Sequence, residues 1–185
     1  MKNILYGILI ILFLNSCSTD KSSSVLVETE GFKNKGGWFI DQQSMDEMGS
    51  PYLIAHGMGI PVEDAYTTVT FSTTGAYRMY VRTRNWTAVW SEKPAGCFQV
   101  LIDGKPTGKE FGIKKREWDW IDGGTVEINK LQTMISLHDL TGFNGRCDAI
   151  YFTPEGSDTP PNTLEGIDQM RKDLLDLDNL KKSLE

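Results

Sequence analysis

The sequence has 185 residues, of which 25 are acidic and 19 are basic, so the chain carries a formal net charge of −6. This length is sufficient for one domain with a well-developed hydrophobic core. A negatively charged domain is a poor partner for the phosphate backbone, and nucleic-acid binding is therefore excluded from the candidate functions.

The first 16 residues have the pattern of a secretory signal peptide. Lys2 precedes an apolar run that ends at Leu14, and this run is too short to span a bilayer. The following "LNSC" resembles the lipobox of bacterial lipoproteins, in which a cysteine, here Cys17, is acylated. Residues 17–24 are rich in serine and predict a polar tether. We expect an exported chain, lipid-anchored to a bacterial membrane on the periplasmic or cell-surface side. A plain signal peptide with an incidental cysteine is the alternative.

Residues 25–155 predict an all-β module. Apolar and polar residues alternate within "AYRMYVRTR", and glycine, asparagine and aspartate punctuate the sequence between successive runs. No helical periodicity separates these runs, which favours an antiparallel β-sandwich. The predicted strands lie at 24–30, 67–73, 76–84, 97–104, 124–130, 132–140 and 147–153.

Residues 156–185 predict a linker followed by an amphipathic helix over 163–184. "TPPN" marks the boundary, and apolar residues then recur at helical spacing. A helix this short is marginal alone in water, so its apolar stripe needs the sandwich, a second copy or a further domain as a partner. The stripe comprises Ile167, Met170, Leu174, Leu177, Leu180 and Leu184.

Four of the five tryptophans lie in two polar, charged segments, whereas Trp38 lies in an apolar context and is predicted to be core. Indole rings can stack on the C–H faces of sugars, while neighbouring polar groups bond the hydroxyls. The alternative is that some of these rings fill the ends of the sandwich. The predicted glycan-binding residues are Trp86, Trp90, Trp118 and Trp120, with Arg84, Asp119 and Asp139 as hydrogen-bond partners.

The stretch "LHDLTGFNGRCDAIYF" gathers several reactive side chains between two predicted strands. His138, Asp139 and Arg146 are best explained as residues that hold a turn together. Cys147 as a nucleophile, and a hydrolase based on Asp139 or Asp148, remain minor alternatives, since the chain shows no catalytic motif. In an oxidising compartment, Cys97 and Cys147 could form a disulfide or stay as two free thiols.

The order of "VLVETEGF", "GAYRMYVRTR", "CFQVLIDG" and "CDAIYFT" resembles that of strands in jelly-roll, galactose-binding-like carbohydrate-binding modules. In such modules an E-x-E opening strand and an aspartate in the last strand hold a structural calcium ion. The resemblance implies that Glu28, Glu30 and Asp148 are calcium ligands here, and oxygen-bearing side chains suit that cation. The alternative is that the two glutamates form an ordinary solvated face.

A second resemblance rests on "KGGWFIDQQSMDEMGSPYLIAHGMGIPVEDA", "VRTRNW" and "LHDLTGFNGRCDAI". These segments are similar to the non-catalytic β-sandwich that accompanies the FAD domain in secreted bacterial FAD-dependent oxidoreductases, some of them labelled xanthan lyase-like. The chain lacks the glycine-rich flavin fingerprint, so we expect neither FAD binding nor catalysis. The sequence thus predicts a surface-anchored lipoprotein with a non-catalytic carbohydrate-binding-like accessory module. The alternative is a detached or truncated sandwich domain whose flavin domain lies elsewhere.

Overall fold

The computed structural model describes residues 23–87, 94–154 and 159–184. The predicted signal peptide, Cys17, most of the tether and Trp90 lie outside these ranges. Within them, no helix combines the length and the apolar character needed to cross a membrane.

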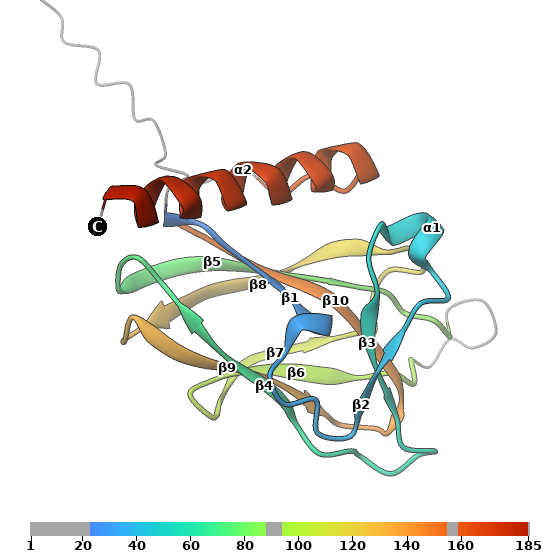
Figure 1. The fold of residues 1–185 in the computed structure, drawn as a ribbon. Helices are drawn as coiled ribbons and strands as arrows, with labels where there is room; N and C mark the ends of the chain where they lie inside the picture. The colour runs from blue at the N-terminus through green and yellow to red at the C-terminus, as the bar shows by residue number, and fades with distance from the viewer. Residues whose placement is uncertain (1–22, 88–93, 155–158, 185) are drawn as a thin grey trace, which may run out of the picture.

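Two antiparallel sheets packed face to face form the body of the protein (Figure 1). This arrangement confirms the predicted β-sandwich. The six-stranded sheet runs in the order β2 (Trp38–Asp41), β3 (Tyr52–His56), β10 (Phe143–Pro154), β5 (Gly75–Thr83) and β8 (Asp119–Ile128), and β1 (Val25–Glu28) also pairs with β10. The four-stranded sheet runs in the order β4 (Ala65–Thr70), β9 (Gln132–Asp139), β6 (Phe98–Ile102) and β7 (Lys105–Phe111).

The core lies between the two sheets and follows from the alternation of side chains along each strand. In β5, Tyr77, Met79 and Val81 point into the core, because successive residues of a strand face opposite sides of a sheet. Trp38 also belongs to this core, which confirms its predicted burial.

Three strands and a short helix were not predicted from the sequence. β2 and β7 are edge strands, and β7 is a largely exposed, polar stretch, so neither shows a strong alternation of apolar residues. The short β3 carries little periodic signal, and helix α1 (Met45–Met48) is a single turn. Their positions are decided by packing with neighbouring elements, which the local pattern does not encode.

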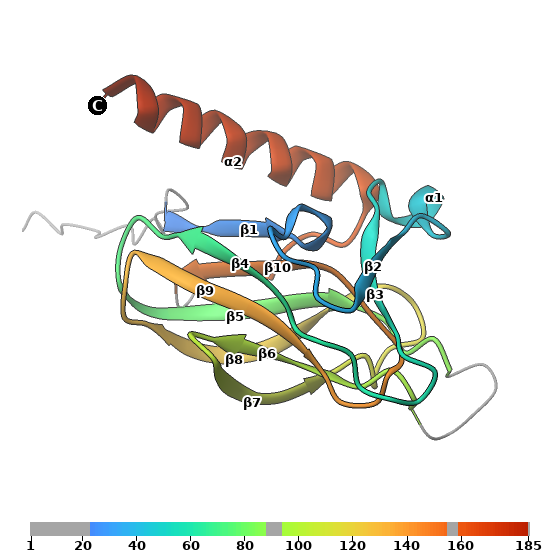
Figure 2. The same ribbon diagram turned by 60° about the horizontal axis from the view of Figure 1, so that its bottom comes forward.

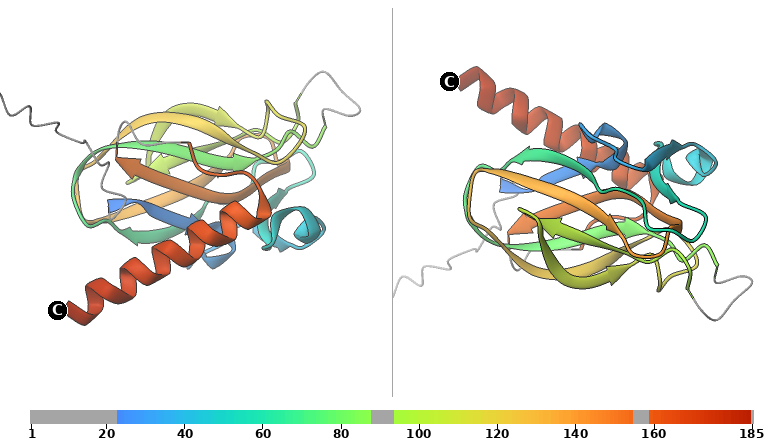
Figure 3. Two further views of the ribbon diagram at one scale, coloured as in Figure 1. Left: turned by 90° about the horizontal axis from the view of Figure 1, so that it is seen from above. Right: turned by 90° about the horizontal axis from the view of Figure 1, so that it is seen from below.

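The predicted C-terminal helix is present as α2 (Leu164–Leu184). It crosses the outer face of the six-stranded sheet, and its C-terminal end extends beyond the sheets (Figures 2 and 3). Met170 and Leu174 pack against a cluster formed by Tyr80, Trp120, Ala149 and Tyr151. The sandwich is therefore the partner of this part of the apolar stripe. The side chains of Leu177, Leu180 and Leu184 lie outside the described part.

The chain enters the sandwich at one end and β3 ends at the other. Val25 at the start of β1 pairs with Phe152, near the end of β10, whereas His56 at the end of β3 pairs with Phe143 at its start. At a rise of about 3.3 Å per residue, these two ends of the sandwich are separated by roughly 30 Å. Any feature built around His56 and Phe143 is therefore remote from the start of β1.

Candidate functional site

Trp118 is part of a small buried cluster and is not available to a sugar. Its ring is only 5% exposed and packs edge-on against Tyr52, with 4.8 Å between the ring centroids. Met48 of α1 completes the cluster, and the guanidinium of Arg84 lies 5.9 Å from the centroid of the indole. The prediction of Trp118 as a stacking platform is wrong, because α1 and Arg84 cover the ring. Arg84 accordingly contacts Trp118, not an open site.

Trp120 is buried beneath α2. Its ring is 6% exposed and contacts Tyr151, and its indole N–H donates to the Pro161 carbonyl at 2.9 Å. The prediction of Trp120 as a sugar platform is also wrong. The sequence places the ring correctly on a strand but does not reveal that a later helix covers that face.

Asp139 has a structural role. It is 1% exposed, and its carboxylate accepts the main-chain N–H groups of Val62, Thr141 and Gly142 at 2.9 to 3.1 Å. These bonds tie the turn after β9 to the loop after β3, as the structural interpretation of the sequence proposed. Its predicted role as a sugar ligand is therefore wrong.

Asp119 is partly exposed, but local contacts engage its carboxylate. One oxygen accepts the N–H of Trp120 at 2.9 Å, and the other lies 3.3 Å from the Lys115 ammonium. Because Asp119 adjoins two buried rings and no exposed one, it has no aromatic platform beside it. A role in binding a sugar at this position stays a prediction.

Of the three predicted tryptophans that the structure describes, Trp86 lies on an accessible surface. It follows β5, and its half-buried ring stacks on Phe143 with 5.6 Å between centroids and 25° between the planes. The indole N–H donates to the Phe143 carbonyl at 3.1 Å. The Arg146 guanidinium lies 5.0 Å from the centroid of the Trp86 ring. Because β5 and β10 are neighbours, the end of one strand and the start of the other bring these three side chains together.

We call Trp86, Phe143 and Arg146 the aromatic platform. Phe143 is 43% exposed, and the sequence does not indicate its role because a single phenylalanine in a turn carries no periodic signal. The Arg146 guanidinium donates to the Asn144 carbonyl at 3.0 Å, a bond to the backbone of the turn that agrees with the structural role expected from the sequence. A guanidinium against an indole face contributes a cation–π attraction that orders both groups.

Polar and apolar groups surround the platform. His56 and Asn144 form a side-chain hydrogen bond beside Phe143, and both side chains offer further donors and acceptors. Met58 and Ile60 project from the loop after β3 and are largely exposed. The Gly142 carbonyl accepts the N–H groups of Gly57 and Gly59, so this loop is fixed against the turn before β10.

The outer surface of the six-stranded sheet continues the platform toward its edge. Ile54 pairs with Arg146 on one side and with Phe39 on the other. Phe39 is exposed and Ile54 is half-buried, so an apolar row leads from the aromatic platform across β3 to β2.

The three predicted calcium ligands lie near one another at the junction of β1, η2 (Thr29–Gly31) and β10. The hydroxyl of Thr29 donates to the carbonyls of Cys147 and Asp148 at 2.6 and 2.9 Å, which holds the turn against β10. Burial raises the pKa of Glu30 to about 7 and the pKa of Asp148 to about 6. Both shifts reflect the cost of removing a carboxylate from water.

Basic side chains of the protein already engage two of these carboxylates. One Asp148 oxygen accepts from Arg82 at 2.9 Å, and one Glu28 oxygen accepts from Arg171. Calcium takes six to eight oxygen ligands. In the part of the chain that the structure describes, no group of three histidine, cysteine, aspartate or glutamate side chains is arranged to hold a metal ion. Calcium binding by Glu28, Glu30 and Asp148 stays a prediction of the sequence.

Cys97 and Cys147 are both buried and free, so a disulfide between them is not formed. Cys97 directly precedes β6 in one sheet and its thiol lies 3.3 Å from a Glu110 carboxylate oxygen, whereas Cys147 belongs to β10 in the other sheet. Burial raises the pKa of Cys97 to about 12 and the pKa of Cys147 well above its usual value. Both thiols are therefore protonated at neutral pH, which argues against either as a nucleophile.

Comparison with solved structures identifies the fold. A family 35 carbohydrate-binding module of Clostridium thermocellum superposes with a TM-score of 0.56 at 15% identity, covering 70% of this chain and 97% of the module. The chain has the fold of a carbohydrate-binding module. The C-terminal family 6 module of a laminarinase from Zobellia galactanivorans gives a TM-score of 0.53 at 16% identity, over 71% and 99% of the two chains.

A multidomain enzyme contains the same fold. The Podospora anserina β-(1,4)-mannanase, which joins a family 26 glycoside hydrolase to a family 35 module, superposes with a TM-score of 0.57 at 18% identity over 75% of this chain. This chain spans only 29% of the length of that enzyme. No protein-family model matches the sequence, and no curated protein matches it either.

Proposed function

We propose that the protein is a non-catalytic carbohydrate-binding module, lipid-anchored through Cys17, that binds a glycan with its aromatic platform. The observation that carries the proposal is the stack of Trp86 on Phe143 at an accessible end of the sandwich. The fold shared with carbohydrate-binding modules supports it.

The chemistry of the platform suits a sugar. A hydrogen bond to a solvated hydroxyl adds only about 1 kcal/mol, because it replaces a bond to water. Apolar contact with a large rigid ring adds burial at low entropic cost. The neighbouring polar groups are the Asn144 and His56 side chains and the Arg146 guanidinium. Hydrogen bonds from these groups would fix the orientation of the sugar on the aromatic ring.

The position of the platform suits a tethered module. The tether enters at the start of β1, roughly 30 Å from the end of the sandwich that carries Phe143. A chain anchored through Cys17 would then hold the platform away from the membrane surface.

A glycan array tests the proposal, with the mature chain carrying Cys17→Ser as the probe. For any glycan that binds, Trp86→Ala and Phe143→Ala should each weaken the affinity about tenfold or more, equivalent to about 1.4 kcal/mol. Tyr66→Ala is the matched control, because Tyr66 is also an exposed aromatic residue but lies in β4 of the other sheet. Equal losses in all three variants, or no bound glycan, would refute the proposal.

One observation favours a second candidate, a sandwich that serves a flavin-carrying partner chain. The three segments that resemble the sandwich of FAD-dependent oxidoreductases contain β2, β3, the end of β5 and the start of β10, which meet around the platform. A neighbouring reading frame with a glycine-rich flavin fingerprint, and co-purification of its product with this chain, would support this candidate. Independent purification of the two would argue against it.

A further inference from the structure

The junction of β1 and β10 contains three carboxylates, Glu28, Glu30 and Asp148, which we call the acidic cluster. Asp148 is fully buried at the irregularity in the pairing of β10 with β5. Glu28 and Glu30 are half-buried, and one oxygen of each is buried without a hydrogen-bond partner among the described residues. Carboxylates removed from water are costly unless positive charge compensates them.

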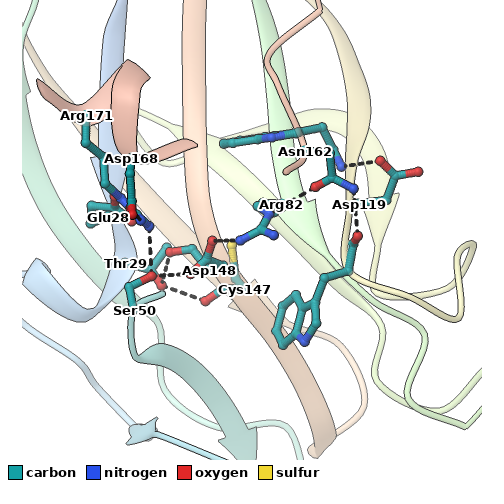
Figure 4. Close-up of polar contacts among 12 residues, drawn as sticks. Glu28, Thr29, Ser50, Arg82, Asp119, Cys147, Asp148, Asn162, Asp168 and Arg171 are labelled. Carbon is teal, nitrogen blue, oxygen red and sulfur yellow. Dashed lines mark hydrogen bonds and ion pairs between the residues drawn. The ribbon is translucent and has the colours of Figure 1, made fainter. Parts of the chain in front are cut away.

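One compensating charge comes from the sandwich itself. The Arg82 side chain of β5 is 2% exposed, and its Nη1 donates to Oδ2 of Asp148 at 2.9 Å. Its Nε donates to Oδ1 of Asn162 at 3.2 Å, and the Nδ2 of Asn162 donates to the Trp118 carbonyl. Arg82 therefore links the cluster to the segment that leads into α2 (Figure 4).

The second compensating charge comes from α2. All three guanidinium nitrogens of Arg171 are engaged: Nε bonds Glu28, Nη2 donates to Oγ of Ser50 at 2.8 Å and Nη1 donates to Asp168 at 3.1 Å. The Ser50 hydroxyl in turn donates a hydrogen bond to Oδ1 of Asp148 at 3.1 Å. The Arg171 side chain is 19% exposed, and its contacts with Glu28, Ser50 and Asp168 are drawn in Figure 4.

We propose that Arg171 is a built-in counter-ion of the acidic cluster and that α2, by supplying it, takes the place of a bound metal ion. Two guanidinium groups then balance Glu28 and Asp148 from two separate elements. The apolar contacts of Met170 and Leu174 with the sheet place α2 so that Arg171 reaches the cluster. The proposal is independent of glycan binding.

Thermal melting of the mature Cys17→Ser chain, in EDTA and in millimolar calcium chloride, tests the proposal. The wild type should melt at the same temperature in both, because the counter-ion is part of the chain. Arg171→Gln should melt lower by roughly 5 °C or more. Lys172→Gln is the matched control: it removes the same charge from an exposed neighbour in the same helix and should melt like the wild type.

A double-mutant cycle separates charge compensation from packing. If Arg171 neutralises Glu28, Arg171→Gln in a Glu28→Gln background should lower the melting temperature less than in the wild-type background. Arg171→Lys keeps the charge and should lie between wild type and Arg171→Gln, which keeps the comparison available if the glutamine variant does not fold. A wild type that loses stability in EDTA and regains it with calcium would overturn the proposal. Additive losses in the cycle, or an Arg171→Gln variant that melts like the wild type, would also overturn it.

Discussion

At the residue scale, buried polar groups distinguish structural from binding roles. Asp139 and Arg146 lie within one short stretch of sequence, yet Asp139 is enclosed by main-chain N–H groups and Arg146 lies against an accessible indole. Burial separates the two roles, since a ligand can reach only a group that water reaches. This criterion assigns Asp139 to the fold and Arg146 to the platform.

Replacing Asp139 should destabilise the protein and leave the platform intact. Asp139→Ala removes the acceptor of three main-chain N–H groups, one of them buried, which we expect to cost about 3 kcal/mol. Urea denaturation measures this loss, with Asp64→Ala as the control, because the Asp64 carboxylate is 37% exposed and bonds the ring of His138. If the Asp139→Ala variant is as stable as the wild type but no longer binds glycan, Asp139 is a binding residue and the structural assignment is wrong.

Glu30 should make the stability of the protein depend on pH. Burial raises the pKa of Glu30 from 4.5 to about 7, with Glu28 and Asp148 adding to the rise and Arg171 opposing it. A carboxyl group with a raised folded-state pKa keeps its proton more tightly in the native state. Its contribution to stability is therefore complete below pH 4.5 and is lost as the pH rises through about 7.

The measurement is the melting temperature between pH 5 and 8. It should fall across this range in the wild type, and Glu30→Gln should flatten the fall and melt higher than the wild type at pH 8. Asp148, whose pKa is raised to about 6, contributes in the same sense at the lower end of the range. Glu127→Gln, on an exposed position of β8, should keep the wild-type profile; a Glu30→Gln profile parallel to the wild type would contradict the assignment.

At the element scale, the sequence predicts elements with strong periodicity and not the contacts between them. The alternation in β5 and the helical spacing in α2 follow directly from repeats of two and 3.6 residues. The burial of Trp118 and Trp120 does not, because it depends on α1 and α2 covering the outer face of the sheet. Trp86 is half-buried and stacks on Phe143, a contact between residues far apart in the chain that the local pattern does not encode.

The apolar contacts of α2 should be measurable one residue at a time. Leu174 packs against the sheet, whereas the adjacent Leu175 is 62% exposed. Leu174→Ala should therefore lower the free energy of unfolding by about 1–2 kcal/mol, since the side chain is only half-buried. Leu175→Ala should change it by less than about 0.5 kcal/mol. Equal effects of the two substitutions in chemical denaturation would mean that α2 does not rest on the sheet in this orientation.

At the scale of the whole molecule, the sandwich has two distinct ends. The tether enters where β1 begins, and the platform occupies the end where β3 stops and β10 starts. The resemblance of individual segments to known modules predicts the fold. It does not predict that the start of β1 and the platform lie at opposite ends of the sandwich, which we call the polarity of the sandwich. Polarity follows from the pairing of β1 and β3 with opposite parts of β10.

Anchoring at Cys17 should accordingly be separable from glycan binding. The apolar run ending at "LNSC" predicts acylation of Cys17, so metabolic labelling with a radioactive fatty acid should mark the wild type and fail for Cys17→Ala. Because the platform lies roughly 30 Å from the start of β1, the unanchored variant should bind a soluble glycan fragment as tightly as the anchored protein does in liposomes, within about twofold. Trp86→Ala should show the reverse pattern, with normal labelling and lost binding. Equal labelling of Cys17→Ala and the wild type would contradict the prediction that Cys17 is acylated. Weaker glycan binding by the anchored form alone would mean that the platform faces the membrane.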